Sequence, residues 1–373
     1  NIPEVAAPNA KLSKIFGAAR PASVKIVAKV DNASLFNPNH QDSPDNPHDN
    51  LDSTIGIGTG FFISEDGLVL TAYHVVDITE FNFKPEFTKL IKFEAISPDN
   101  QSYPLELIAF DAILDLALLQ AKTDHKVAKL NLATRSPRKG AEIVAIGNSR
   151  NDFLAARSGR VIQLGITGPK GRFADQTIEL SAPLAAGDSG GPVLNTKGEV
   201  IGVTSYIAYN PGGLESNSPH VPRILKPFVD ELPDYASFAI NLAENPQTII
   251  NLKAGVNRDV PVIGFSSGPN LDYNPDLSSV YLGELPGAVV NTVAKNGPAE
   301  QAGLRSLQRD SAQGIIIADV IVAIDDVKTP TMNDVIDLLF DKEVGDEVIL
   351  TVQREAKTIK LKLVLGAKSK VFN

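Results

Sequence analysis

The chain has 373 residues, of which 43% are hydrophobic and 21% charged, as in an ordinary globular protein with room for two or three domains. Its formal net charge of −9 argues against nucleic acid or an anionic membrane as a main partner, and no run approaches the ~18 apolar residues of a membrane span. Cysteine is absent, which excludes disulfides and thiolate sites and leaves the redox compartment open.

The chain begins at Asn1 rather than at a methionine. We interpret this as a processed or truncated start that has lost a signal peptide, although a cloning boundary explains it equally well. Residues 1–17 then form an N-terminal segment ahead of the first predicted strand.

Residues 18–255 are predicted to form a first domain made of short strands. Runs rich in Val and Ile alternate with Gly, Asn and Pro turns, a pattern typical of a barrel or sandwich. A long insertion over 207–235 contains a predicted short helix at 223–229, and a helix from Pro246 to Ala254 ends at Gly255. The expected strands are 23–27, 60–63, 68–73, 142–146, 177–180, 200–203 and 237–240.

Residues 256–373 are predicted to form a second domain of a common size. A short helix over 297–304 precedes an apolar strand region at 315–325. Thr331 is expected to cap an amphipathic helix over 333–340, and antiparallel strands follow at 348–352 and 358–365.

Three segments of the first domain carry residue types that suit nucleophilic catalysis. Ser189 lies in the glycine-dense turn Ala186-Gly187-Asp188-Ser189-Gly190-Gly191, His74 closes a strand-like run, and Asp115 opens an apolar one. A serine hydroxyl needs a base to take its proton, and that base needs a carboxylate to fix its tautomer. We predict a His74–Asp115–Ser189 triad, with the backbone amides of Gly187 and Ser189 forming the oxyanion hole.

Each of these residues taken singly would fit an ordinary structural role, and only their conjunction favours catalysis. Asp111 is the rival acid, and Asp115 is preferred because the apolar run after it would anchor it in the core. Asp188 is expected to be a structural carboxylate beside the oxyanion loop. His40 and His48 lie in a loop rich in Asp, Asn and Pro without compact metal-ligand spacing, so no metal or cofactor is expected.

The motifs together resemble the HtrA/Deg family of serine proteases, in which a trypsin-like protease domain precedes one PDZ domain. The first half is carried by residues 58–63, the three triad segments and 237–240, and the second half by 297–304, 319–325 and 344–348. The resemblance implies a mainly β fold, a trypsin-like double six-stranded Greek-key β-barrel followed by an α+β PDZ domain. It also implies a homotrimer or a multiple of trimers, to which residues 1–17 contribute, in the periplasm, the cell envelope or an organelle lumen.

The resemblance also assigns residues around the predicted sites. Leu184 matches the base of the primary specificity pocket, and its aliphatic side chain suggests cleavage after small or medium apolar residues. Arg172 matches a regulatory sensor arginine, although an ordinary exposed arginine fits as well. For peptide binding at the PDZ domain, the matching loop is Val262, Ile263, Gly264 and Phe265, and the helix residues are Val335, Leu338 and Leu339, for which packing in the domain's own core is an equal alternative.

Three features depart from the family pattern: Asp188 stands where the family usually has Asn, residues 260–264 form an atypical carboxylate loop, and the insertions at 78–100 and 207–235 are long. The first hypothesis is an ATP-independent endopeptidase of protein quality control that cleaves unfolded or damaged proteins through an acyl-enzyme. The alternatives are a chaperone-like or scaffold protein with a latent protease, and a regulatory protease with one dedicated substrate.

Overall fold

The computed structural model describes residues 7–31, 52–78, 89–165, 177–209, 235–267, 287–310, 315–355 and 357–372. The chain divides into two compact units, Asn1–Arg258 and Asp259–Asn373, whereas the sequence places the division after residue 255. Arg172, His40, His48 and the helix predicted at 223–229 lie outside the described residues.

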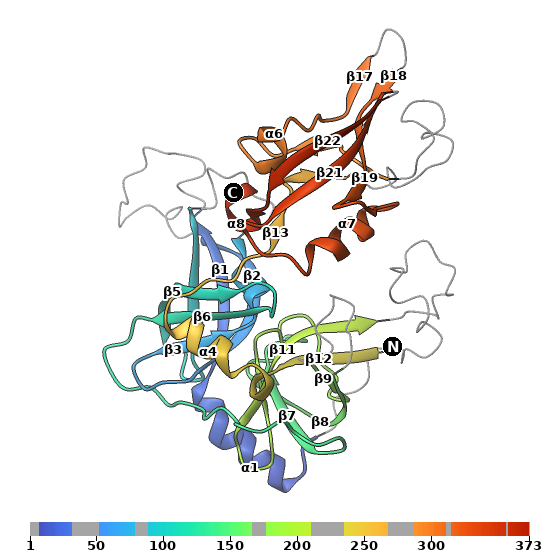
Figure 1. The fold of residues 1–373 in the computed structure, drawn as a ribbon. Coiled ribbons are helices and arrows are strands. Elements are labelled where there is room, and N and C mark those ends of the chain that lie inside the picture. Colours follow the sequence, from blue (N-terminus) through green and yellow to red (C-terminus); the bar gives the residue numbers. More distant parts are fainter. Residues whose placement is uncertain are drawn as a thin grey trace, which may run out of the picture. The chain divides into compact units, whose positions relative to one another are not determined.

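The first unit contains two closed six-stranded barrels, which confirms the predicted double barrel (Figure 1). The first barrel closes in the order β1-β2-β3-β6-β5-β4 and the second in the order β10-β11-β12-β9-β8-β7. Closure leaves no unpaired sheet edge. The first six strands are β1 (Ser23–Asp31), β2 (Asp52–Phe62), β3 (Leu68–Thr71), β4 (Ile91–Ile96), β5 (Ser102–Asp111) and β6 (Leu116–Ala121). The other six are β7 (Glu142–Gly147), β8 (Ala155–Leu164), β9 (Thr177–Leu180), β10 (Pro192–Leu194), β11 (Val200–Tyr209) and β12 (Tyr235–Asn241).

In chain order, one helix of this unit precedes the barrel strands and another follows them. No helix is predicted before the first strand, yet α1 (Ala10–Ala19) is present. Asn9 caps it, because its side chain accepts a hydrogen bond from the Leu12 amide at 2.9 Å. Leu12 and Ala19 are buried in the main core cluster. The predicted second helix is α4 (Pro246–Lys253), and three single turns are η1 (Arg20–Ala22), η2 (Tyr73–Val75) and η6 (Leu242–Glu244).

The second unit is built on a five-stranded sheet in the order β15-β19-β21-β22, with β20 paired to β19. Helix α7 (Met332–Leu339) begins with a capping box, in which Thr331 and Asp334 exchange side-chain and backbone hydrogen bonds. The sheet strands are β15 (Ala288–Val289), β19 (Asp319–Ile324), β20 (Val327–Lys328), β21 (Glu347–Arg354) and β22 (Lys357–Val364). The short elements are β13 (Pro261–Val262), β14 (Phe265–Ser266), β16 (Thr292–Val293), β17 (Gln308–Asp310), β18 (Ile315–Ile317), β23 (Gly366–Ala367), α6 (Pro298–Gln301) and α8 (Lys368–Val371).

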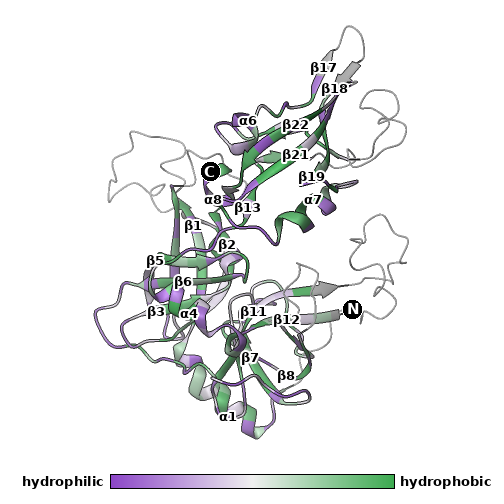
Figure 2. Cartoon of the chain, in the orientation of Figure 1, coloured by the Kyte–Doolittle hydropathy of each residue, from purple (hydrophilic) through white to green (hydrophobic). Residues whose placement is uncertain are grey.

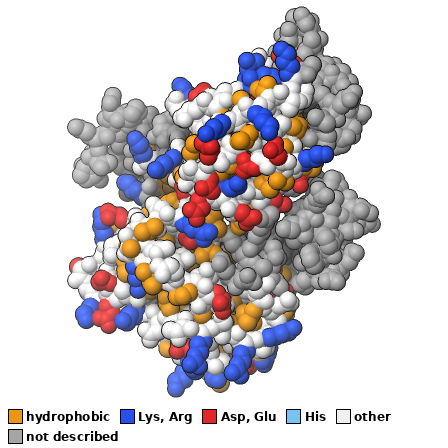
Figure 3. All heavy atoms as spheres, viewed as in Figure 1, with side chains coloured by type: hydrophobic (Ala, Val, Ile, Leu, Met, Phe, Trp, Pro, Cys, Tyr) orange, Lys and Arg blue, Asp and Glu red, His pale blue; other side chains and the backbone are white. Residues whose placement is uncertain are grey.

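Hydrophobic residues concentrate along the strands of both units (Figure 2). On the face drawn in Figure 3, charged side chains of both signs are interspersed with apolar ones. Among the described residues, no helix combines the length and the apolar character that crossing a membrane requires.

Candidate active site

His74 lies in the single turn η2 that follows β3. The sequence predicted a strand through residue 73, but β3 ends at Thr71, because the Tyr73 amide is drawn to the Asp115 carbonyl at 3.1 Å. The His74 amide then donates to Asp115 Oδ1 at 2.9 Å, and the ring Nδ1 lies 2.8 Å from Asp115 Oδ2. The backbone amide and the ring Nδ1 of His74 are therefore both held by the Asp115 carboxylate, and the second ring nitrogen, Nε2, is not part of this contact.

Asp115 precedes β6 with a φ of 56°, a left-handed conformation that aspartate tolerates better than most residues. Its carboxylate also accepts a hydrogen bond from the Ser205 hydroxyl. Burial alone raises the pKa of Asp115, but the hydrogen bond and charge of His74, together with the Ser205 hydroxyl, outweigh burial and lower that pKa below its ordinary value. Asp115 is thus an anionic acceptor that orients the imidazole.

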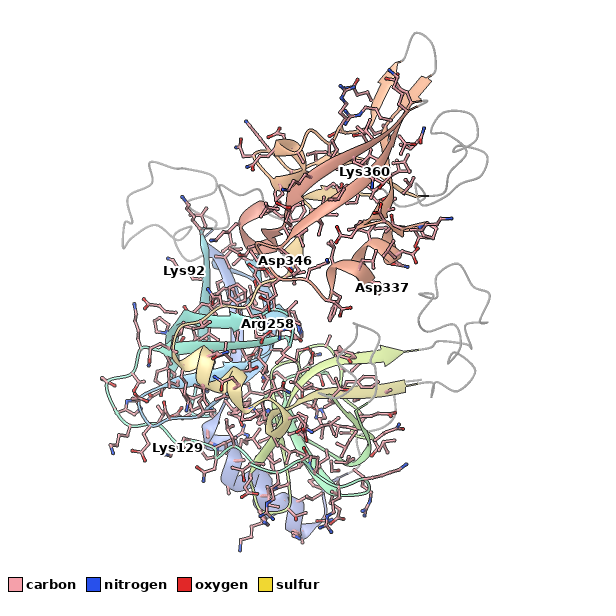
Figure 4. The ribbon with its side chains drawn as sticks, viewed as in Figure 1. Lys92, Lys129, Arg258, Asp337, Asp346 and Lys360 are labelled. Carbon is pink, nitrogen blue, oxygen red and sulfur yellow. The ribbon has the colours of Figure 1, made fainter. Side chains whose placement is uncertain are left out.

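Asp111, the rival acid, faces a different set of partners. Its Oδ1 accepts the backbone amides of Ile113 at 3.1 Å and Leu114 at 2.9 Å, and Oδ2 lies 3.7 Å from Arg258 Nη1. Burial raises the pKa of this carboxyl, although these partners act in the opposite direction. Arg258, labelled in Figure 4, meets this turn where its backbone pairs with the end of β5. Asp111 therefore caps the turn before Asp115.

Ser189 is linked to the same region through Ser205. The Ser189 hydroxyl donates to the Ser205 carbonyl at 3.3 Å, while the Ser205 hydroxyl donates to Asp115. Within the described part of the chain, no hydrogen bond joins Ser189 to His74. Ser205 thus links Ser189 to Asp115, which in turn holds His74, while the Ser189 hydroxyl is turned to a carbonyl.

The turn that carries Ser189 is held by the first barrel. The Thr59 hydroxyl donates to the Gly187 carbonyl at 2.7 Å, and the Thr59 amide donates to the Ser189 carbonyl at 2.8 Å. Gly190 has a φ of 84°, and a Cβ built there would lie 2.0 Å from Thr71 Oγ1, so only glycine fits. The amides of Gly187 and Ser189 donate to no backbone acceptor among the described residues, and their role as an oxyanion hole stays a prediction.

The residues assigned to specificity and peptide binding occupy varied environments. Leu184 is fully buried in a cluster of the second barrel, and Val335 and Leu339 are buried in the core of the second unit, where Leu338 packs half-buried against them. In the predicted carboxylate loop, Val262 is half-buried and Ile263 and Phe265 are buried. Gly264 has a φ of 90°, and its carbonyl accepts the Ala294 amide at 2.9 Å. Their roles at the pocket and the groove stay predictions.

Sequence reasoning missed Ser205, Thr59 and Arg157, which all contact predicted site residues. Thr59 of β2 and Ser205 of β11 contact residues of the other barrel, and Arg157 of β8 contacts Asp188 within its own barrel. No local motif indicates these contacts. Over the residues that the structure describes, no group of three or more His, Asp or Glu side chains is close enough to hold a metal ion.

Two family models match the chain: the trypsin-like peptidase domain over residues 58–203 and the PDZ domain over residues 261–365. A probable periplasmic serine endoprotease, DegP-like, from Chlamydia trachomatis is 28% identical over 314 residues, which cover 82% of this chain and 52% of that protein. A serine protease Do-like HtrA from Bacillus subtilis is 25% identical, covering 96% of this chain and 74% of its own length. The chain spans about half the length of the DegP-like relatives that it matches.

A solved structure described as HtrA-type protease AlgW with decapeptide shares the fold, with a TM-score of 0.50 at 21% identity over 96% of this chain and 98% of that one. A second AlgW structure with a decapeptide has a TM-score of 0.52 at 20% identity, covering 96% and 97% of the two chains. The predicted resemblance is confirmed. The chain carries a trypsin-like peptidase domain followed by one PDZ domain, and over most of its length it is similar to HtrA/DegP serine endoproteases.

Proposed function

We propose that this chain is an ATP-independent serine endopeptidase of protein quality control, with Ser189 as nucleophile, His74 as general base and acid, and Asp115 as the orienting carboxylate. The observation that carries the proposal is the pair of contacts from one Asp115 carboxylate to the His74 amide at 2.9 Å and ring Nδ1 at 2.8 Å. That pairing leaves Nε2 as the acceptor for a serine proton.

The reaction follows from these placements. Ser189 Oγ attacks the scissile carbonyl carbon while its proton passes to His74 Nε2. The resulting oxyanion accepts hydrogen bonds from the backbone amides of Gly187 and Ser189. The carbon–nitrogen bond then breaks, the proton passes from His74 to the leaving amine, and an ester to Ser189 remains. Water activated by His74 hydrolyses this ester and restores the hydroxyl.

Peptide substrates are supported by the PDZ domain and by the decapeptide in the AlgW structures. Leu184 supports cleavage after small or medium apolar residues, because its aliphatic side chain offers no carboxylate to pair with a Lys or Arg of the substrate. Homotrimer assembly, or a multiple of trimers, and a periplasmic, envelope or organelle-lumen location belong to the same proposal. The relatives that suggest this location are named periplasmic or chloroplastic.

A chaperone-like protein with a latent protease is the second candidate. It is favoured by one observation, the hydrogen bond from the Ser189 hydroxyl to the Ser205 carbonyl at 3.3 Å, because catalysis requires that hydroxyl to turn towards His74.

Hydrolysis of unfolded casein by the wild type, Ser189→Ala and Ser13→Ala decides between these candidates. Ser13 is an exposed serine on α1, so its variant is the matched control. The endopeptidase predicts hydrolysis by the wild type and Ser13→Ala and none by Ser189→Ala. Equal turnover by wild type and Ser189→Ala would refute it, whereas suppression of casein aggregation by both without cleavage would favour the chaperone-like candidate.

A further inference from the structure

A guanidinium group is buried beside the turn that carries Ser189. The side chain of Arg157 in β8 is 1% exposed, and its Nε lies 3.6 Å from Oδ2 of Asp188, whose side chain is 0% exposed. Arg157 Nε has no hydrogen-bond partner of its own. Its Nη2 donates to the Ser149 carbonyl at 3.0 Å and pairs with Asp152 Oδ2 at 3.0 Å. Two opposite charges therefore face each other in the protein interior.

The Asp188 carboxylate connects two loops of the second barrel. It accepts hydrogen bonds from the Ser149 backbone amide at 2.9 Å, the Ser149 hydroxyl at 2.7 Å and the Ala185 backbone amide at 3.0 Å. A Cβ built on Gly147 would lie 2.0 Å from Asp188 Oδ1, so a glycine there leaves room for the carboxylate. The loop before Ser189 is thus fixed to residues 147–149.

The position of Asp188 in the chain gives this connection a consequence. Asp188 stands between Gly187 and Ser189, whose amides form the proposed oxyanion hole, so the placement of its carboxylate sets the orientation of both peptide groups. A buried carboxylate without a cation is strongly unfavourable. Without Arg157, the buried Asp188 carboxylate would keep only the Ser149 and Ala185 donors, and a shift of the carboxylate would move the two amides.

We propose that Arg157 is a positioning residue, and that its ion pair with Asp188 holds the Gly187 and Ser189 amides in their oxyanion-binding orientation. The cation comes from a neighbouring strand of the same barrel. The inference rests on the proposed function, because it concerns the same hydrolytic site.

Steady-state hydrolysis of fluorescently labelled casein by four variants tests this role. Arg157→Met removes the cation that faces the buried Asp188 carboxylate, and Asp188→Asn removes the carboxylate that faces Arg157 Nε while Arg157 Nη2 keeps Asp152. Each variant is expected to lower kcat on the order of 100-fold with little change in KM, as the loss of an oxyanion donor does. The double variant carries neither charge of the Arg157–Asp188 pair, and we expect its kcat to recover about tenfold over Asp188→Asn, since residues in contact are non-additive. Arg160→Met is the matched control, because Arg160 lies in the same strand but forms an exposed ion pair with Glu142.

Thermal unfolding of each variant separates positioning from plain stability. A structural role alone would lower Tm and leave the kcat of folded protein unchanged. An Arg157→Met enzyme that is folded and has wild-type kcat would overturn the inference. If that variant does not fold, a double variant no more active than Asp188→Asn overturns it instead. If the wild type hydrolysed casein no faster than Ser189→Ala, the proposed function would be wrong, and this inference would be wrong with it.

Discussion

Two carboxylates four residues apart have opposite surroundings in this protein. Asp115 faces an imidazole and a hydroxyl, which lower its pKa against the effect of burial, whereas burial dominates at Asp111 and raises its pKa. The apolar run after Asp115 favoured it as the partner of His74, and the contacts at 2.8 and 2.9 Å place it there.

Replacing Asp115 by Asn is expected to lower kcat by a factor of about 10⁴, because the amide neither fixes the imidazole tautomer nor stabilises the imidazolium. Casein hydrolysis under saturating substrate measures this change, with circular dichroism to show that the variant is folded. A folded Asp115→Asn enzyme with kcat near that of wild type would show that another group orients His74.

The same two carboxylates predict opposite pH dependences of stability. Asp115 has a lowered folded pKa, so its ionised form stabilises the fold above the ordinary value of 3.8, and this stability is lost as pH falls through the lowered value. Asp111 has a raised folded pKa, so its contribution is present below 3.8 and is lost as pH rises through the raised value. Denaturant unfolding of the wild type, Asp111→Asn and Asp115→Asn between about pH 3 and pH 7, the range in which carboxyl groups titrate, measures both pH dependences.

The expected result concerns the wild type minus each variant. The difference in unfolding free energy should rise with pH for Asp115→Asn and fall with pH for Asp111→Asn. Two differences with the same sign of slope would show that these surroundings do not govern the two groups.

The residue types of the site could be predicted from the sequence because each triad residue lies in a distinctive local motif. Ser205, Thr59 and Arg157 could not, because their roles depend on contacts that form only in the folded protein: a hydroxyl of β11 in the second barrel lies beside Asp115 of the first, and a guanidinium of β8 lies beside Asp188. Such contacts leave no periodic or local signal.

At the scale of elements, β2 supports the turn that carries Ser189. Thr59 is fully buried, and its hydroxyl donates to the Gly187 carbonyl at 2.7 Å and accepts a hydrogen bond from the side-chain Nδ2 of Asn148 at 2.9 Å. Strand β2 of one barrel therefore holds two loops of the other. The carbonyl of Gly187 is fixed by this side chain.

Replacing Thr59 by Val should lower the unfolding free energy by about 1–3 kcal/mol, because the Gly187 carbonyl and the Asn148 side-chain amide lose a buried hydrogen-bond partner. It should also lower kcat, since Gly187 loses its anchor. Thr134→Val is the matched control, because Thr134 is exposed. Urea unfolding and casein hydrolysis measure the two effects, and a Thr59→Val protein indistinguishable from Thr134→Val would contradict the role of this hydroxyl.

Seven of the twelve barrel strands overlap ranges that the sequence predicts, because Val and Ile concentrate in them, as in residues 142–146 and 200–203. Strand β4 lies inside the predicted insertion at 78–100, and its mixture of apolar and charged residues, most of them only half-buried, gave little signal of a strand. The turn η2 replaced the predicted end of a strand because of a long-range hydrogen bond between Tyr73 and Asp115. Local propensity decides regular strands, and tertiary contacts decide these exceptions.

At the scale of the whole molecule, each unit has its own core. The cluster of the second unit runs from Ile263 to Leu365, and the main cluster of the first unit runs from Leu12 to Leu252. No residue belongs to both of these clusters, so each unit has the means to fold by itself.

Replacing Leu350 by Ala should therefore destabilise the second unit alone, by about 2–5 kcal/mol, because Leu350 is fully buried in β21. Scanning calorimetry of the full chain should show one transition moved to lower temperature and another unchanged. Ile349→Ala is the control, since Ile349 is a neighbour on the same strand and is 41% exposed. A single transition that moves as a whole would contradict independent cores.

The central claim is that Ser189 is a nucleophile activated by His74. Treatment of the full chain with a fluorophosphonate, followed by intact mass and peptide mapping, tests it most directly. We predict one adduct on Ser189 in the wild type, much slower labelling in His74→Ala, and none in Ser189→Ala. An unlabelled wild type, or the same adduct in Ser189→Ala, would contradict the claim.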